Sequence, residues 1–204
     1  MKHPSHVKTQ LKNHPQKGSS ITVDPIRNLE DIESIKNLLK DNPRDYLLFV
    51  MGINNGLRTG DLLKLRNEMF KNAEINQKIP IKEEKTGKPQ EIVINSSVKD
   101  ALDGYFAKFD GEYEYLFQST RGFWPISVPV VNRMIKNWCK KVGLKGNFGS
   151  HTLRKTFGYV LRRHHKVPWE LISKRYNHSS PAVTRNYLGI QDEEVNDIIL
   201  KYPI

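Results

Sequence analysis

Four short stretches of the sequence place ionisable side chains next to apolar segments, where they could take part in chemistry. In "GLRTGD", Arg58 lies between two apolar helical patterns, so its guanidinium group is expected to be partly buried and to need an anion. A structural ion pair with Asp61 would meet that need as well as a substrate would. In "EEKTGK", Lys85 lies at a predicted hairpin turn, either as a solvated residue or as a proton donor to a substrate.

The third stretch, "HTLR", places His151 and Arg154 three residues apart, so that both lie on one face of a predicted helix. We assign the N-cap of this helix to Ser150. The N–H groups in the first turn of a helix favour an anion. The spacing alone is common in a chain of this composition, so it identifies no site by itself.

In the fourth stretch, "NHSSPAVTRNYLGI", Ser180 and Pro181 predict the start of a short helix and Gly189 predicts its end. His178 then lies just before the helix, and Tyr187 lies further along it. A histidine and a tyrosine at this spacing also occur by chance. The stretch is therefore either an ordinary capped helix or the site of a reactive tyrosine beside a polar partner.

The composition favours a polyanionic partner. The 204-residue chain carries 33 Lys and Arg against 22 Asp and Glu, a net charge of +11. This excess favours nucleic acid first and anionic membranes second, although a generally basic surface would give the same count. No apolar run approaches the roughly 18 residues of a membrane span, and the N-terminus lacks the apolar core of a secretory signal. We expect no membrane association.

The single cysteine, Cys139, excludes an intramolecular disulfide, so a reducing, cytoplasmic setting is expected. Cys139 lies on the apolar side of a helical pattern, and we interpret it as a small core residue.

Hydrophobic periodicity predicts a mainly α fold with a small three-stranded antiparallel β-sheet. Helical spacing begins near residue 29, and Gly56 is expected to end the second helix. Between residues 73 and 95 the pattern alternates around "KTGK", which we interpret as three short strands with Lys85 near the tip of the second hairpin. The predicted division is a basic flexible tail or linker at 1–25, one domain at 26–190 and a C-terminal helix at 191–204.

The order of these stretches along the chain is more specific than any one of them. The pieces "GLRTGDLLKL", "KTGKPQEIVI", "SHTLRKTFGYVL" and "NHSSPAVTRNYLGI" resemble the catalytic domain of the tyrosine recombinases, the phage integrase family, over roughly residues 28–190. The resemblance implies the DNA breaking-rejoining enzyme fold and site-specific DNA recombination or integration. The six functional positions of the family are all filled, by Arg58, Lys85, His151, Arg154, His178 and Tyr187.

Three features depart from the family pattern. Asp61 stands where the family more often has glutamate. Asn177 stands where a glycine usually precedes the histidine, and because asparagine tolerates a left-handed backbone, the turn is expected to survive. Family members usually carry an N-terminal helical core-binding domain that completes a clamp around DNA, whereas only some 25 residues precede the catalytic region here. The chain is either a fragment or a minimal member.

The resemblance implies roles that the residue types suit. Arg58 and Arg154 would hold the non-bridging oxygens of a phosphodiester with paired donors, and His178 would add a third. Tyr187 would attack phosphorus and form a covalent 3′-phosphotyrosine, in a cationic pocket that must favour its phenolate.

Proton transfer falls to two residues, His151 as acceptor or relay and Lys85 as general acid for the leaving 5′-oxygen. The covalent bond conserves the energy of the phosphodiester, so the reaction needs no ATP and no cofactor. No metal is implied, because the carboxylates show no paired ligand pattern and the histidines have no zinc spacing with the one cysteine.

The expected partners are double-stranded DNA and further copies of the chain, as a dimer or tetramer on DNA. The basic segment "LRRHHK" at 161–166 is either a contact to DNA phosphates or solvated surface. The last helix, which carries apolar residues at 195 and 198–200, could pack on its own domain or dock on a neighbouring subunit, as such tails commonly do in the family.

Two other functions remain open. Type IB topoisomerases use a related pocket to relax DNA, and a non-catalytic DNA-binding module would need only the basic helical surface. The trailing helix and "HTLRKTF" favour a recombinase over the first, and the six filled positions count against the second.

Overall fold

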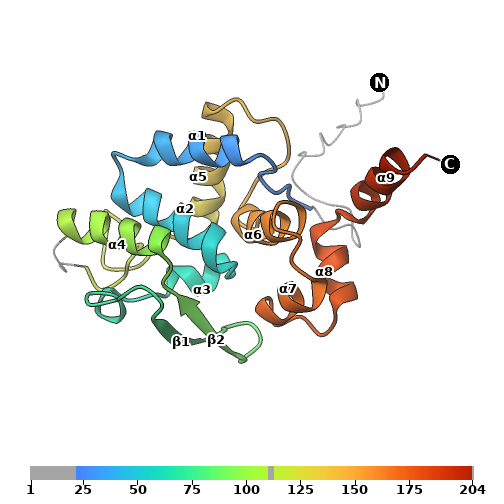
Figure 1. Ribbon diagram of the computed structural model, residues 1–204. Coiled ribbons are helices and arrows are strands. Elements are labelled where there is room, and N and C mark those ends of the chain that lie inside the picture. The colour runs from blue at the N-terminus through green and yellow to red at the C-terminus, as the bar shows by residue number, and fades with distance from the viewer. Residues whose placement is uncertain (1–21, 110–112, 204) are drawn as a thin grey trace, which may run out of the picture.

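The computed structural model describes residues 22–109 and 113–203, and within these ranges the fold is mainly helical with one small antiparallel sheet (Figure 1). The helices are α1 (Leu29–Leu39), α2 (Pro43–Asn55), α3 (Thr59–Leu63), α4 (Ser96–Lys108), α5 (Val128–Lys141), α6 (Thr152–Arg163), α7 (Trp169–Arg175), α8 (Pro181–Leu188) and α9 (Gln191–Lys201), with a 3-10 helix η1 at Asn67–Met69. The strands are β1 (Lys78–Lys82) and β2 (Pro89–Val93). None of the helices described is long and apolar enough to cross a membrane.

Helix α2 is the centre of the main hydrophobic core. Its residues 47–51 are completely buried, and it packs against α1, α4 and α6. Gly52 allows the closest of these contacts, since a Cβ atom there would lie 2.6 Å from Leu153 of α6. The core also takes in Cys139, which is 1% exposed, as expected; burial raises the pKa of its thiol to about 12. The main core therefore fixes the end of α2 beside the start of α6.

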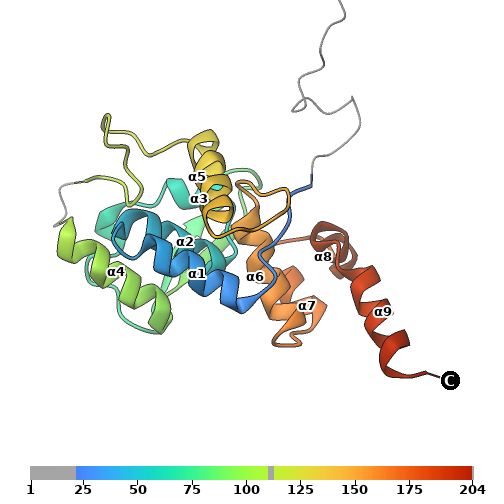
Figure 2. The ribbon, with the colours of Figure 1, turned by 90° about the horizontal axis from the view of Figure 1, so that it is seen from above.

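A second, smaller hydrophobic cluster joins α6, α7 and α8, which form a group to one side of the main core in Figures 1 and 2. Its central residues are Tyr159, Trp169, Ile172, Tyr176, Leu188 and Ile190. Helix α6 contributes to both clusters, so it connects the two halves of the molecule.

The prediction of three strands is wrong, because the sheet has two. The segment before β1 bends at Asn76, whose φ of 70° is left-handed and cannot continue a strand. The N–H of Gln77 donates to Glu74 in a turn, and the N–H of Asn76 donates to Ile94 over 2.7 Å without forming a ladder. Lys85 therefore lies in the turn of the one hairpin that is present.

The glycine and serine signals at helix ends are mostly confirmed. Gly56, with φ of 59°, ends α2, and Gly189, with φ of 67°, ends α8. The Ser180 side chain accepts from the backbone of the first turn of α8, as expected. Ser150 does not cap α6; its N–H donates to Asn132 Oδ1 of α5 over 3.0 Å, and the N-cap falls on the next residue.

Two arginines of "LRRHHK" bind α9, so neither expectation for them is confirmed. Arg162 Nε lies 2.5 Å from Glu194, and Arg163 Nη2 lies 2.6 Å from Asp197. These ion pairs attach α9 to α6, and Figures 1 and 2 show that α9 otherwise projects away from the body of the protein. Its apolar side chains are at least 49% exposed: Val195, Ile198, Ile199 and Leu200.

Residues 1–21 of the predicted tail lie outside the described residues. Its last part packs on the domain, because the N–H of Asp24 donates to the Asn147 carbonyl over 2.7 Å. The next residues continue this contact, with the N–H of Ile26 donating to Thr156 Oγ1 over 2.9 Å.

Gly56→Ala should lower the free energy of unfolding by about 2–4 kcal/mol. Alanine would have to adopt the left-handed φ of 59°, and its Cβ would lie 2.4 Å from the Phe157 ring. Urea denaturation followed by circular dichroism measures the change. Gly104→Ala in α4 is the control, because the added methyl group meets nothing within 4 Å. Equal losses in the two variants would contradict the argument.

Candidate active site

The six residues predicted to form a site lie on segments that meet beside the C-terminal end of α2. They are Arg58 before α3, Lys85 in the β1–β2 turn, His151 and Arg154 at the start of α6, His178 before α8, and Tyr187 on α8. Arg58 and Arg154 both lie close enough to change the pKa values of His151, His178 and Tyr187. The charge of Lys85 also acts on His151, so the structure brings all six side chains toward one place.

Arg154 is the most deeply buried of the six, at 3% exposed. Its Nη1 donates to the Gly56 carbonyl over 2.6 Å, and its Nη2 donates to the Tyr176 carbonyl over 2.9 Å. The guanidinium carbon lies 4.3 Å from the centroid of the Tyr176 ring, which adds a cation–π contact. Burial lowers the pKa of Arg154, but an arginine remains charged at any physiological pH.

Arg58 pairs with Glu83, and not with Asp61. Its Nη1 lies 2.8 Å from Glu83 Oε2, and the Glu83 side chain is completely buried. Burial by itself would raise the pKa of Glu83, but hydrogen bonds from Thr86 and Arg58 outweigh it and hold that pKa below its usual range. Nη1 of Arg58 is buried, and Glu83 is its one partner among the described residues. The Arg58 side chain is 19% exposed, so it remains partly accessible to a ligand.

The turn that carries Lys85 is fastened on both sides. Asp61 Oδ1 accepts from the N–H of Glu84 over 2.9 Å, which ties the turn to α3. Thr86 Oγ1 donates to Glu83 Oε2 over 2.5 Å, which ties it to the carboxylate that pairs with the arginine. Lys85 itself is exposed and forms no ion pair within the described ranges. Its ammonium group is thus free to turn toward a ligand.

The base of the hairpin is bonded to the segment that precedes α8. Lys88 Nζ donates to the Asn177 carbonyl over 3.1 Å, and Asn177 Nδ2 donates to the Pro89 carbonyl over 3.1 Å. Gln90 Nε2 also donates to the Arg175 carbonyl over 2.7 Å. Asn177 has a φ of 54°, so it adopts the left-handed backbone that was expected of it. The turn before His178 is therefore preserved with asparagine.

His178 is oriented by a threonine on α8. Its Nδ1 lies 2.9 Å from Thr184 Oγ1, and Thr184 is completely buried. When the hydroxyl donates to Nδ1, the proton of the neutral ring is on Nε2, which becomes a donor toward the pocket. Burial, with the charges of Arg154 and Arg58, lowers the pKa of His178 to about 4, so the ring is neutral at pH 7.

Tyr187 lies beside the other histidine, with its hydroxyl 3.5 Å from His151 Nδ1. Burial raises the pKa of Tyr187 to about 12, although Arg154 and Arg58 act in the opposite direction. The two arginines thus favour the phenolate, as expected of a cationic pocket, but burial outweighs them in the unliganded site. Burial and the surrounding cations lower the pKa of His151, which makes it a neutral acceptor for the phenol proton.

Sequence reasoning missed two residues of the pocket for which a signal exists. Glu83 is in phase with Ile79 and Ile81, so the alternation of β1 continues inward and predicts a buried carboxylate. Thr184 lies three residues before Tyr187 on α8, so it shares the face that looks into the pocket. Tyr176 was also missed, and nothing in its local sequence marks it.

The described residues contain no group of three or more His, Cys, Asp or Glu side chains that could hold a metal ion. The chemistry of the pocket is that of cations, a neutral imidazole donor and a phenol beside a neutral imidazole. Such a set can bind an oxyanion and transfer a proton from the phenol.

Comparison with known proteins defines the class. The profile of the Phage integrase family matches residues 27–194, which is most of the chain, so the protein belongs to the phage integrase family. It is 41% identical over 172 residues to "Probable integrase/recombinase YoeC" of Bacillus subtilis (strain 168), covering 84% of this chain and 92% of that protein. It is 26% identical over 183 residues to tyrosine recombinase XerC of Caldanaerobacter subterraneus subsp. tengcongensis, covering 85% of this chain and 50% of that one.

Solved structures share the fold. The XerA recombinase superposes with a TM-score of 0.70 at 20% identity, over 94% of this chain and 67% of that one. XerH recombinase bound to palindromic difH substrate, in a post-cleavage complex, superposes with a TM-score of 0.71 at 17% identity, over 88% of this chain and 53% of that one. The chain thus spans about half the length of XerC and XerH.

We predict that His178 titrates near pH 4 and that Thr184 sets its tautomer. In the unfolded chain this group titrates near 6.5, so the folded state should lose stability as the pH falls from about 6.5 toward 4. Long-range ¹⁵N–¹H NMR of the ring nitrogens reports both properties. Thr184→Val should change the populations of the two neutral tautomers, whereas Thr184→Ser keeps the hydroxyl and should preserve them. An unchanged spectrum in Thr184→Val would show that Thr184 does not set the tautomer of His178.

Proposed function

We propose that this protein is a site-specific DNA recombinase or integrase that breaks and rejoins DNA through a covalent 3′-phosphotyrosine. The observation that carries the proposal is the convergence of Arg58 and Arg154 on Tyr187, whose hydroxyl lies 3.5 Å from the neutral acceptor His151. Membership of the phage integrase family and the similarity to recombinase folds support the same activity.

The arginines bind the scissile phosphate in this proposal. Arg154 is held by two carbonyl groups, so its position is fixed before a substrate arrives. Arg58 contributes a second guanidinium group, which Glu83 holds in place through Nη1 at 2.8 Å. His178 donates from Nε2 as a third contact to the non-bridging oxygens, since Thr184 occupies Nδ1. Three preorganised donors stabilise the charge that gathers on these oxygens in the transition state.

Tyr187 then attacks phosphorus, and two protons move. The phenol oxygen forms a bond to phosphorus while the bond from phosphorus to the 5′-oxygen breaks. Because the pKa of Tyr187 is about 12, its proton must pass to a base, and His151 receives it. Lys85 donates a proton to the leaving 5′-oxygen from the exposed turn. Attack by the 5′-hydroxyl of another strand reverses these steps, without ATP or a metal ion.

The alternatives are less well supported. DNA relaxation of the topoisomerase IB type would use a related pocket, and a non-catalytic DNA-binding module would need no tyrosine beside a base. The family match extends over residues 27–194, and the relatives that it joins are named as integrases and recombinases.

The proposed partners are double-stranded DNA and further copies of the chain. Relatives of this fold have been solved on DNA, among them a lambda integrase dimer bound to a COC′ core site. We assign catalysis to residues 26–190, treat 1–25 as a basic tail or linker, and place the activity in the cytoplasm. The exposed apolar face of α9 is proposed to dock on a neighbouring subunit, which would connect assembly to the helix that carries Tyr187.

Tyr187→Phe should abolish covalent attachment to DNA, because the Tyr187 hydroxyl is the one bonded to His151 among the described residues, while the neighbouring Tyr176 hydroxyl is bonded to the Arg154 carbonyl. Wild-type protein is incubated with a library of nicked duplexes of randomised sequence, and the detergent-resistant adduct is isolated. Mass spectrometry of the digested adduct should place the nucleotide on Tyr187. An adduct of equal yield in Tyr187→Phe, or one on another residue, would refute the assignment. Binding of uncleaved duplex should survive in the variant and serves as its control.

Removal of residues 191–204 should prevent multimers on DNA while leaving binding of a single copy. A milder test is Leu200→Asp, at a side chain that is 81% exposed and therefore not needed for the fold. Sedimentation velocity of the protein–DNA complex distinguishes one bound copy from two or more. Leu38→Asp on α1, 39% exposed, is the matched control and should sediment as wild type. An unchanged profile for the truncated chain would contradict docking in trans.

A further inference from the structure

The loop between α4 and α5 exposes two adjacent aromatic side chains. Phe123 is 84% exposed and Trp124 is 75% exposed, more than any other aromatic side chain in the described part of the chain. Trp124 differs in this respect from the other two tryptophans, Trp138 and Trp169, which are 5% and 8% exposed. Two neighbouring aromatic rings in water indicate a surface that a partner covers.

The loop is held closed at its neck, so the aromatic pair is displayed on a defined support. The N–H of Ser119 donates to the Trp124 carbonyl over 2.9 Å, and the N–H of Ile126 donates to the Phe117 carbonyl over 2.8 Å. The N–H of Arg121 donates to the side chain of Ser119 over 3.2 Å. These bonds reduce the entropy that the loop would lose when a partner binds.

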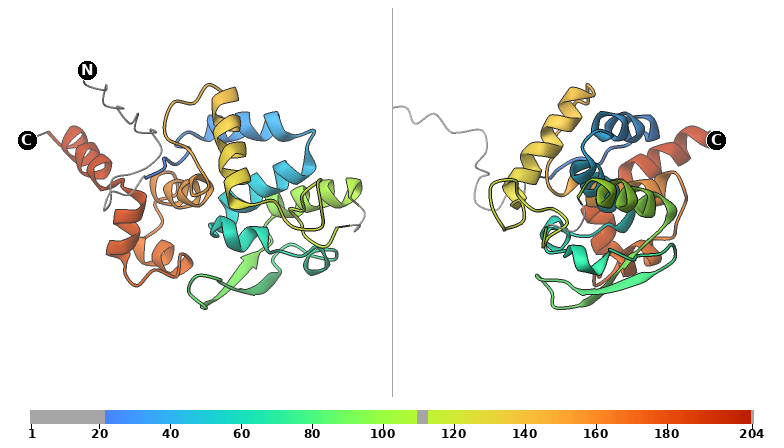
Figure 3. Two further views of the ribbon diagram at one scale, coloured as in Figure 1. Left: turned by 180° about the vertical axis from the view of Figure 1, so that it is seen from behind. Right: turned by 90° about the vertical axis from the view of Figure 1, so that its left-hand side faces the viewer.

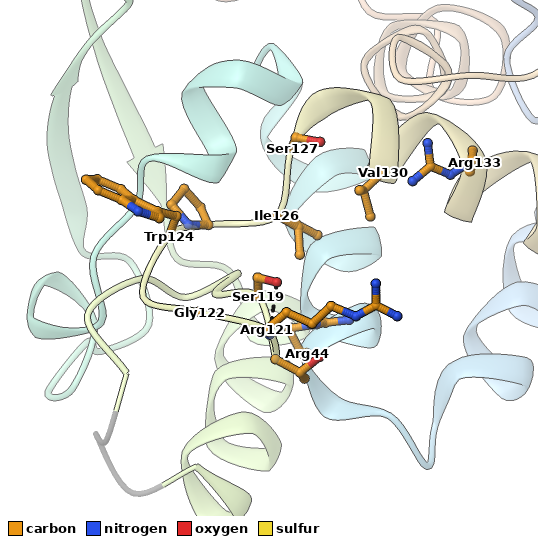
Figure 4. A pocket seen from close by; sticks show the side chains of 11 residues that line it. Arg44, Ser119, Arg121, Gly122, Trp124, Ile126, Ser127, Val130 and Arg133 are labelled. Atoms are coloured by element: carbon orange, nitrogen blue, oxygen red, sulfur yellow. Dashed lines mark hydrogen bonds between the residues drawn. The ribbon is translucent and has the colours of Figure 1, made fainter.

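Trp124 lines a hollow of about 500 Å³ whose charged lining residues are all basic (Figure 4). Three arginines line it, namely Arg44, Arg121 and Arg133, together with serine, threonine and apolar residues. Arg44 is neutralised by Asp45 at 2.8 Å. The other two arginines form no ion pair within the ranges that the structure describes, so their charges are available to an anionic partner.

The hollow is connected to the candidate active site through α5. Asn132, the neighbour of Arg133 on α5, accepts from the N–H of Ser150, the residue before His151. The Ser150 carbonyl in turn accepts from Thr59 Oγ1 of α3 over 2.6 Å. In the left view of Figure 3, α5 and the loop that leads into it lie in front of α1 and α2, on the side where α3 is also seen.

We propose that loop 119–127 and Arg133 form a second DNA contact, which binds the duplex next to the phosphodiester that is cleaved. Arg121 and Arg133 bind backbone phosphates, and the exposed rings of Phe123 and Trp124 pack against the sugars of the duplex. Guanidinium groups match phosphate oxygens in geometry, and exposed aromatic rings bury apolar surface against sugars whatever the base sequence. An acidic protein surface would satisfy the arginines but would not need the aromatic pair. The assignment rests on the proposed function for the identity of the polyanion.

The fluorescence of Trp124 can report whether DNA covers this side chain, because the other tryptophans are buried. Acrylamide should quench a component of the wild-type fluorescence that is missing in Trp124→Phe. Saturating 30-base-pair duplex DNA, taken from the sequences recovered in the covalent adduct, should remove most of that component. A Trp124 that remains as accessible to acrylamide on DNA as in the free protein would overturn the proposal.

Affinity measurements separate the two kinds of contact. Trp124→Ala should weaken DNA binding about 5- to 30-fold, the effect of truncating one aromatic side chain that a partner covers, without changing its salt dependence. Arg121→Ala and Arg133→Ala should each reduce the slope of log K against log salt by about one. The control is Leu38→Ala, which should bind as wild type. Leu38 is on α1, and α1 lies behind α5 in the left view of Figure 3.

Failure of this proposal is distinguishable from failure of the proposed function. Trp124 does not touch the reacting atoms, so at saturating DNA the Trp124→Ala protein should form the Tyr187 adduct in normal yield. A normal adduct together with unchanged affinities in all three variants would refute the second contact alone. Absence of an adduct with wild-type protein would refute the proposed function, and protection of Trp124 by 30-base-pair duplex DNA of randomised sequence would still test the contact.

Discussion

The burial of one guanidinium group sets the geometry of the whole pocket. Arg154 is 3% exposed, and a charge removed from water needs hydrogen-bond partners that are fixed in place. It finds them in the carbonyl groups of Gly56, at the end of α2, and Tyr176, at the end of α7. The Tyr176 hydroxyl donates back to the Arg154 carbonyl, and Gly158 leaves the space that this hydroxyl needs, since a Cβ there would lie 2.3 Å from it. Helix α6 is therefore locked to both of its neighbours by a single charge.

Burial and neighbouring cations change the pKa of each titratable group around this arginine. Which of the two prevails depends on whether the ionised form of the group is positive or negative. For His178 both influences disfavour the protonated ring, so its pKa falls to about 4. For Tyr187 they oppose each other and burial prevails, which keeps the phenol protonated. For Glu83 they also oppose each other, but hydrogen bonds from Thr86 and Arg58 prevail and the carboxylate stays ionised. The same pocket thus holds a neutral acid, neutral bases and a charged carboxylate at one pH.

The sequence predicted the parts that depend on local chemistry. Left-handed glycine at the end of α2, the Ser180 cap and the tolerance of Asn177 follow from the properties of single residues, and all are confirmed. The prediction of a third strand was wrong because the alternating pattern of residues 73–77 does not reveal the left-handed backbone of Asn76. The ion pair considered for Arg58, with Asp61, is not the one that forms. Its partner Glu83 is distant in sequence and reaches it only through the fold of the hairpin. The six candidate residues lie on segments that meet beside the end of α2, whereas the residues that orient them were not foreseen.

The bonds at the base of the hairpin have a consequence for how the lysine could move. Lys88, Pro89 and Gln90 are joined to residues 175–177, while Glu83 is joined to Arg58. Only the turn residues between Glu83 and Lys88 can move independently. A shift of the segment that leads into α8 would therefore also shift the strands. In the proposed reaction, a displacement of α8 that withdraws the tyrosine would therefore withdraw the general acid as well. A subunit with its tyrosine displaced would then neither attack the phosphodiester nor protonate the leaving 5′-oxygen. Such a subunit could not release a 5′-end that it was unable to rejoin.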